Sequence, residues 1–114
     1  MAGFARKAMF VALAVAMLFS APASAQSASS AQELSHCAGA VAAQANLDVF
    51  AYPRGANGEW APVLGRILEA LNREEGVEGM TGRYAASAAK GFWQDQPAAE
   101  RAAAANECRA RFGS

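Results

Sequence analysis

The sequence predicts an all-α fold: a small up-down bundle of about four helices, closed by one disulfide and preceded by a cleaved signal peptide. Three observations support this prediction. Alanine, the strongest helix former, makes up 22 of the 89 residues that follow the predicted signal peptide. Apolar residues recur at three- and four-residue intervals, and no segment has the alternating pattern of a strand. Two cysteines, Cys37 and Cys108, stand near opposite ends of this helical part.

Residues 1–25 have the three parts of a secretory signal peptide. Arg6 and Lys7 form a positive n-region, residues 8–19 are uncharged and apolar, and residues 23–25 read Ala-Ser-Ala, a small-x-small cleavage site. A membrane-spanning helix is the alternative, but the apolar run is shorter than the roughly 20 residues that a bilayer requires. We therefore expect cleavage after residue 25, export to a bacterial periplasm or beyond, and no stable membrane anchor in the mature protein.

Length and charge limit what the mature chain can be. The 89 residues from 26 to 114 suffice for one domain, which we place at residues 30–114, with a thin core of marginal stability. Loss of Arg6 and Lys7 leaves 8 basic and 10 acidic residues, a net charge of about −2. This balance argues against nucleic acid as a partner.

The first helix is predicted after a disordered lead at residues 26–29. Ser30 and Glu33 fit a capping box, which marks a helix start. Pro53 disfavours helix in the residue before it, so the helix should end near Tyr52. Its apolar stripe consists of Leu34, Cys37, Val41, Ala45 and Val49.

A loop and the clearest amphipathic helix follow. Residues 53–59 contain two glycines and an Asn-Gly turn signal, so they are predicted to form a loop. Pro62 is compatible with the first turn of the second helix, and Gly76 can terminate it. Its solvent face carries Arg66, Glu69 and Arg73 at pairing distance. Its inward stripe is Trp60, Val63, Leu64, Ile67, Leu68 and Leu71.

The third helix has an uncertain start and the fourth a clear one. Glycines interrupt the chain near residue 80, so the third helix can begin anywhere in residues 77–83. Pro97 is suited to the first turn of the fourth helix, and Gly113 to its end. The predicted inward residues are Ala85, Ala88, Ala89, Phe92 and Trp93 in the third helix, and Ala105, Cys108 and Phe112 in the fourth.

The two cysteines are predicted to form a structural disulfide. In an up-down bundle the first and last helices are antiparallel neighbours, which places Cys37 and Cys108 at one level. Closing a loop of this length contributes about 4 kcal/mol in the chain-entropy model. A redox-active pair is the alternative, but the two-residue spacing of such pairs is absent. His36 adjoins Cys37 in sequence, yet neighbours on a helix point about 100° apart and do not form a nucleophile–base pair.

The same topology predicts a candidate binding surface at the end opposite the disulfide. Aromatic residues fall beside the first and third connections, and Arg54, Lys90 and Gln94 surround them. These aromatics either fill the end of an alanine-rich bundle or anchor a protein partner. The candidate surface residues are Tyr52, Arg54, Trp60, Lys90, Phe92 and Trp93.

The residue inventory favours binding over catalysis. No cofactor, metal site or catalytic residue is predicted, because there is one histidine and no recognisable catalytic arrangement. The leading hypothesis is a helical protein that binds another extracytoplasmic protein, as inhibitors and immunity proteins do. A periplasmic stress or acid chaperone is the alternative, and a small-ligand binder or an enzyme of another type is third. Glu74, Glu75 and Glu78 form an acidic turn that is either solvated or meets a basic partner.

Overall fold

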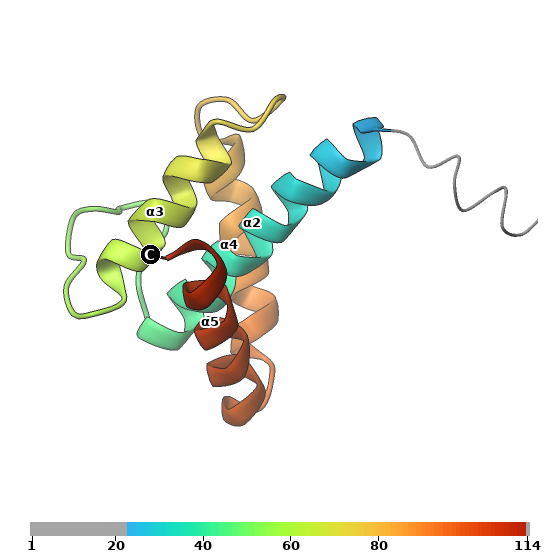
Figure 1. The fold of residues 1–114 in the computed structure, drawn as a ribbon. Coiled ribbons are helices and arrows are strands. Elements are labelled where there is room, and N and C mark those ends of the chain that lie inside the picture. Colours follow the sequence, from blue (N-terminus) through green and yellow to red (C-terminus); the bar gives the residue numbers. More distant parts are fainter. Residues whose placement is uncertain (1–22, 114) are drawn as a thin grey trace, which may run out of the picture.

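The computed structural model describes residues 23–113, which form four helices (Figure 1). In chain order these are α2 (Ala23–Ala45), α3 (Ala61–Asn72), α4 (Thr81–Gln94) and α5 (Ala98–Phe112). No strand occurs in this part of the chain. The all-α prediction is therefore confirmed. Most of the predicted signal peptide, residues 1–22, lies outside the described residues.

Helix α2 is the centre of the bundle and packs against each of the other three helices. Six consecutive residues, from position 37 to position 42, are buried on all sides of the helix. Five of these are cysteine, alanine or glycine, and such small side chains let three helices approach one backbone. The predicted helical bundle is thus observed as three helices around a central one.

The first helix starts earlier than predicted. Helix α2 begins at Ala23, so Ser30 lies inside it and is not its cap. The structure also places the predicted lead of residues 26–29 within the helix. The sequence of residues 23–31 consists of alanine, serine and glutamine, with no glycine or proline to interrupt a helix. Glu33, the second residue of the predicted capping box, instead pairs with Arg111 of α5.

The same helix ends at Ala45, seven residues before the predicted end. Asn46 has a φ of 55°, the left-handed conformation that terminates helices. The amide of Leu47 then donates a 2.9 Å hydrogen bond to the carbonyl of Ala42, as in a Schellman motif. Val49, predicted to lie on the helical stripe, is buried in the following turn.

Helix α3 agrees with its prediction. Its apolar stripe supplies most of the large buried side chains, among them Leu64, Ile67 and Leu71, each fully inaccessible. Pro62 occupies the first turn, and Gly76 has a φ of 86° in the loop beyond the helix. Of the predicted surface pairs, Arg73 pairs with Glu69 at 3.6 Å. Arg66 instead donates a hydrogen bond to the carbonyl of Gly113, at the end of α5.

Helix α4 is rotated from its predicted orientation: Ala89 and Trp93 pack inward as predicted, but the rest of the predicted face does not. Its buried residues are Gly82 and Ala86, whereas Ala85, Ala88 and Phe92 are exposed. Alanine occurs on both faces of this helix, so the spacing of apolar residues did not define its orientation. Close packing does define it: a Cβ at Gly82 would lie 3.1 Å from a methyl group of Val77.

Helices α2 and α5 run antiparallel and are joined covalently. Cys37 and Cys108 form a disulfide with a Cα–Cα distance of 5.4 Å, so the predicted pairing is confirmed. One turn away along both helices, Glu33 of α2 pairs with Arg111 of α5. The middle of α2 therefore lies beside the last turns of α5.

Candidate functional site

The six predicted surface residues do not gather at one end of the bundle. They fall into several separate neighbourhoods along α2, α3 and α5. Trp93 and Phe92 contact His36, which adjoins the disulfide. Trp60 lies under Arg109, the residue after Cys108. The predicted separation of an aromatic pole from a disulfide pole is therefore wrong.

Tyr52 and Trp60 hold the long loop against the helices. The Tyr52 hydroxyl donates a 2.8 Å hydrogen bond to the carbonyl of Ala61, and a Cβ at Gly65 would lie 2.3 Å from that hydroxyl. The Arg109 guanidinium lies 4.2 Å from the centre of the Trp60 ring. These contacts give both aromatics a structural role. Arg54, by contrast, is exposed in the loop.

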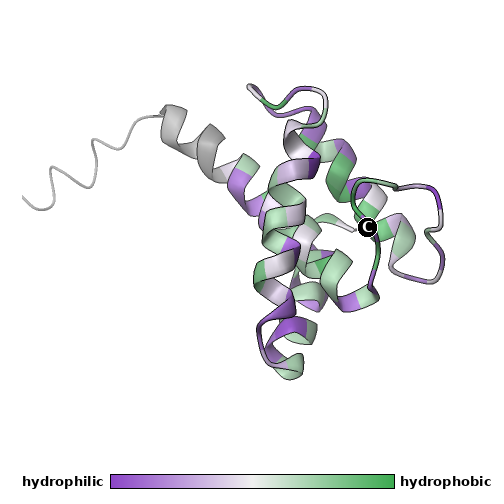
Figure 2. Cartoon of the chain, turned by 180° about the vertical axis from the view of Figure 1, so that it is seen from behind, coloured by the Kyte–Doolittle hydropathy of each residue, from purple (hydrophilic) through white to green (hydrophobic). Residues whose placement is uncertain are grey.

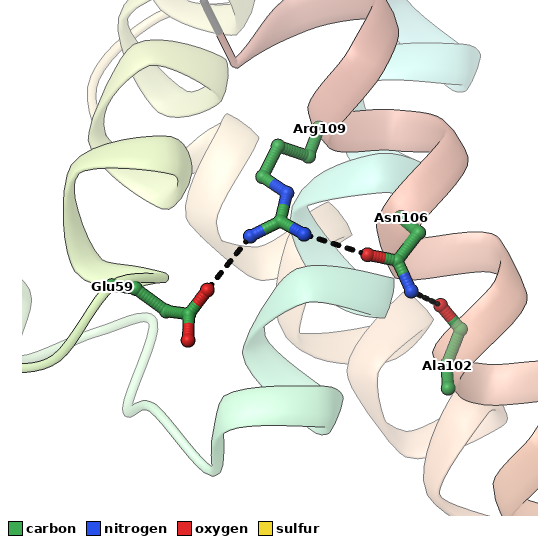
Figure 3. A network of polar contacts seen from close by, with 4 residues as sticks. All are labelled: Glu59, Ala102, Asn106 and Arg109. Atoms are coloured by element: carbon green, nitrogen blue, oxygen red, sulfur yellow. Dashed lines mark hydrogen bonds and ion pairs between the residues drawn. The ribbon is translucent and has the colours of Figure 1, made fainter.

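Arg109 organises a polar network at this junction (Figure 3). Its guanidinium donates to Glu59 Oε1 at 2.9 Å and to Asn106 Oδ1 at 2.8 Å. Asn106 in turn donates a 2.9 Å hydrogen bond to the carbonyl of Ala102. The network joins the start of α3 to the last turns of α5 on the exposed side of the molecule.

The two cations of α4 bind backbone carbonyls and are not free surface charges. Lys90 Nζ donates to the carbonyl of Leu47 at 2.7 Å. Arg83 Nη1 donates to the carbonyls of Val49 at 2.6 Å and Tyr52 at 2.9 Å. Both side chains thereby satisfy carbonyls of the segment that follows α2. Lys90, predicted at the rim of a binding surface, has this structural contact instead.

Asp48 stabilises the same turn through its carboxylate. Asp48 Oδ1 accepts hydrogen bonds from the amides of Phe50 at 2.9 Å and Ala51 at 3.1 Å. These bonds to the ionised form, that from Ala51 first, lower the pKa of Asp48 below its ordinary value. The segment between α2 and α3 is thus held by α4 cations on one side and by its own carboxylate on the other.

Phe92, Trp93 and His36 form an aromatic cluster beside the disulfide. The rings of Phe92 and Trp93 each meet His36 edge to face, with centroids 5.6 and 5.7 Å away. Trp93 Nε1 donates a 3.1 Å hydrogen bond to His36 Nδ1, which assigns an acceptor role to that nitrogen. Phe92 is 49% exposed, so this cluster has a free aromatic face.

A groove of about 850 Å³ lies between α2 and α4, with Phe92 and His36 among its walls. We call it the α2–α4 groove. Helices α2 and α4 are in contact at Gly39 and Ala89, and the N-terminal half of α2 diverges from α4 (Figure 1). The groove is lined by Ala31, Gln32, Glu33, Ser35, His36 and Cys37 of α2, by Thr81, Gly82, Ala85, Ala88, Ala89 and Phe92 of α4, and by Leu71, Val77 and Arg111.

The α2–α4 groove is mostly apolar and nearly neutral. Its lining contains two charged residues, Glu33 and Arg111, and these pair with each other. Alanine and glycine form much of the wall that α4 contributes. Sequence reasoning assigned these alanines to the core, because it could not tell which small-residue face of α4 meets α2. The run of small residues at positions 37–42 was the one signal that α2, not a ring of equal helices, forms the centre.

The described residues show no metal site or membrane helix. Across residues 23–113, histidine, cysteine, aspartate and glutamate side chains do not form a group of three that could hold a metal ion. No helix in this range combines the length and apolar character that crossing a membrane requires. Comparisons of the chain with protein-family models, curated proteins and solved structures found no significant match.

Proposed function

We propose that this chain is a small exported protein that binds another extracytoplasmic protein through the α2–α4 groove and does not itself catalyse a reaction. The observation that carries the proposal is the exposed, uncharged face of α4 beside the groove. Thr81, Ala85, Ala88 and Phe92 lie on this face at three- and four-residue spacing, and all four are exposed. A helical face of this kind is typical of a surface that a partner covers.

Three features support the proposal. The disulfide fixes α2 relative to α5, so one wall of the groove is preorganised, which lowers the entropic cost of binding. Phe92 provides a partly exposed aromatic anchor at the groove, and such residues often dominate binding energy. A disulfide and a signal-like N-terminus both favour an oxidising extracytoplasmic compartment. An inhibitor or immunity protein is the version that best fits a small, rigid chain.

Site-directed photo-crosslinking in the native compartment tests this function. A photoreactive residue at Ala88, in the groove, should yield one dominant adduct of defined mass. The same residue at Ala103, which is exposed on α5 away from the groove, should yield none. Excess unlabelled protein should suppress the adduct. Equal labelling from both positions, or no adduct from Ala88, would contradict the proposal.

A chaperone for unfolded proteins is the second candidate. Met80, Tyr84 and Phe50 add exposed apolar surface on α4 and next to it, with exposures of 46, 66 and 41%. Such surface can hold unfolded chains without a defined partner. Aggregation assays with a denatured client at pH 2–3 and at pH 7 separate the candidates. Suppression of aggregation at either pH supports the chaperone, and no protection at both removes it.

A further inference from the structure

The α2–α4 groove has the dimensions and lining to receive a helix. The groove follows α4 from Thr81 to Phe92, a length of about 17 Å at the helical rise per residue. This length corresponds to about three turns of a bound helix. Ala31, Ser35, Ala85 and Ala88 line it with side chains no larger than serine, which permits close approach of another helix backbone.

The walls of the groove add almost no charge to this site. Glu33 and Arg111 neutralise each other in an ion pair. The two cations of α4, Arg83 and Lys90, are bound to carbonyls of the segment that follows α2. Neither of these cations lines the groove. The wall that α4 contributes therefore contains no charged side chain.

Uncompensated acids border one end of the groove. Val77 and Thr81 belong to its lining, and Glu74, Glu75 and Glu78 lie in the same loop between α3 and α4. The ion pairs of the described residues involve other acids, Glu33, Glu59 and Glu69. Figure 2, which views the molecule from behind, shows this loop at the upper end of α4. A ligand in the groove therefore meets negative charge at this end.

We propose that the α2–α4 groove binds a basic amphipathic helix of a partner protein. The apolar face of this helix packs on Ala85 and Ala88, with Phe92 as the aromatic anchor at one end. Its lysine or arginine side chains lie over Glu74, Glu75 and Glu78 at the other. The inference rests on the proposed function and adds the chemical class of the partner. Helix-in-groove recognition supplies affinity through the apolar face, and charge complementarity supplies specificity.

The test uses the exported, disulfide-bonded protein and labelled synthetic peptides of about 14 residues. The probe is an amphipathic leucine/lysine helix. The controls are a leucine/glutamate helix with the same pattern and a leucine/lysine peptide with scrambled order. Fluorescence anisotropy should show saturable binding of the probe, with binding at least tenfold weaker for both controls.

Variants then locate the binding site. Ala88→Trp should fill the groove and weaken probe binding at least tenfold, and Ala85→Trp serves the same purpose should the first variant fail to fold by circular dichroism. Ala103→Trp, on the exposed surface of α5, is the matched control and should bind like the unsubstituted protein. Replacing Glu74, Glu75 and Glu78 together by glutamine should weaken binding several-fold and reduce its dependence on salt.

The results separate the proposed basic helix from other occupants of the groove. Equal affinity for the lysine and glutamate helices, or binding unaffected by the tryptophan variants, overturns the inference. Self-association that depends on concentration and is abolished by Ala88→Trp, without peptide binding, assigns the groove to a second copy and also overturns it. In each of these cases the crosslinking from Ala88 still decides separately whether the groove binds a native protein partner.

Discussion

The central helix α2 has two sides that are held in different ways. Towards α5 it is tied by the disulfide of Cys37 and by the ion pair of Glu33 with Arg111. Towards α4, its described residues have no disulfide or ion pair, and the contact depends on the close fit of Gly39 against Ala89 and on the aromatic and hydrogen-bond contacts of His36. We call these the tied side and the fitted side; both border the groove, because Glu33, Cys37 and Arg111 line it together with α4. One helix is thus held by a covalent bond on one side and by packing on the other, and the groove opens where the two sides meet.

Breaking the disulfide should have the largest effect on this arrangement. Replacing Cys37 and Cys108 together by alanine should lower the free energy of unfolding by about 4 kcal/mol, because the unfolded chain loses a cross-link that spans 71 residues. Urea titration followed by circular dichroism measures the change. Reduction of the unsubstituted protein is the control and should produce a similar loss. Equal stability with and without the cross-link would show that α2 and α5 do not depend on it.

The fitted side is tested by a matched pair of glycine substitutions. Gly39→Ala should destabilise the protein by about 3 kcal/mol, because the new Cβ would lie 2.4 Å from the Ala89 Cβ and 2.5 Å from backbone atoms. Gly91→Ala should instead stabilise it by about 0.5–1 kcal/mol, since no atom lies within 4 Å of that Cβ and alanine favours helix. Thermal unfolding compares the two. A stabilising Gly39→Ala would contradict the close contact.

Arg83 of α4 stabilises the fitted side through its hydrogen bonds to the segment that follows α2. Arg83→Met keeps much of the side-chain length but leaves the carbonyls of Val49 and Tyr52 without their donor. We expect a loss of about 2 kcal/mol, the usual effect of removing hydrogen bonds to a charged group. Arg54→Met, in the exposed loop, is the control and should change stability by less than about 0.5 kcal/mol. Equal effects of both substitutions would remove the assigned role of Arg83.

The ion pair on the tied side should contribute much less than the disulfide. A double-mutant cycle of Glu33→Gln and Arg111→Gln should give a coupling energy of about 0.2–1 kcal/mol, because both side chains are nearly half exposed. High salt should reduce this coupling. A coupling above 2 kcal/mol at high salt would mean that the pair is far better shielded from solvent than its exposure indicates.

The turn at Asp48 should give the smallest effect, visible through pH. Its folded-state pKa is lowered, so its stabilising contribution is complete above the ordinary value of 3.8 and is lost as the pH falls through the folded pKa. An NMR titration should place the Asp48 pKa below 3.8 in the folded protein. The Ala51→Pro variant lacks the Ala51 amide, whose hydrogen bond contributes most to lowering the pKa of Asp48. In this variant the Asp48 pKa should move back towards 3.8. A value at or above 3.8 in the unsubstituted protein would contradict the hydrogen bonds of this turn.

The sequence was sufficient to predict the elements whose signals are local. The stripe of α3 from Val63 to Leu71 is unambiguous, and the pairing of Cys37 with Cys108 requires only that the first and last helices be neighbours. The end of α2 was missed because Pro53 is a stronger signal than Asn46, although asparagine also adopts the left-handed conformation. These errors concern single residues and the conformation of one turn.

The candidate site could not be predicted, because it depends on which small residues meet. Ala86 and Ala85 are neighbours in sequence, yet one is fully buried and the other lines the groove. Their chemistry is identical, so close contacts such as that of Gly39 with Ala89 fix the rotation of α4. The hydrogen bonds of Arg83 and Lys90 could likewise not be predicted, since their acceptors are backbone carbonyls of a turn that the sequence assigned to a helix.

The bond between positions 37 and 108 also affects how the molecule withstands proteases. Both exposed loops, residues 53–59 and 73–80, lie between the bonded cysteines. A single cut in either loop would leave two fragments that remain covalently joined through α2 and α5. Such a nicked molecule would keep its mass on a non-reducing gel and separate only when the sulfurs are reduced. In the presence of a protease, one cleavage in a loop would then not separate the chain into two free pieces.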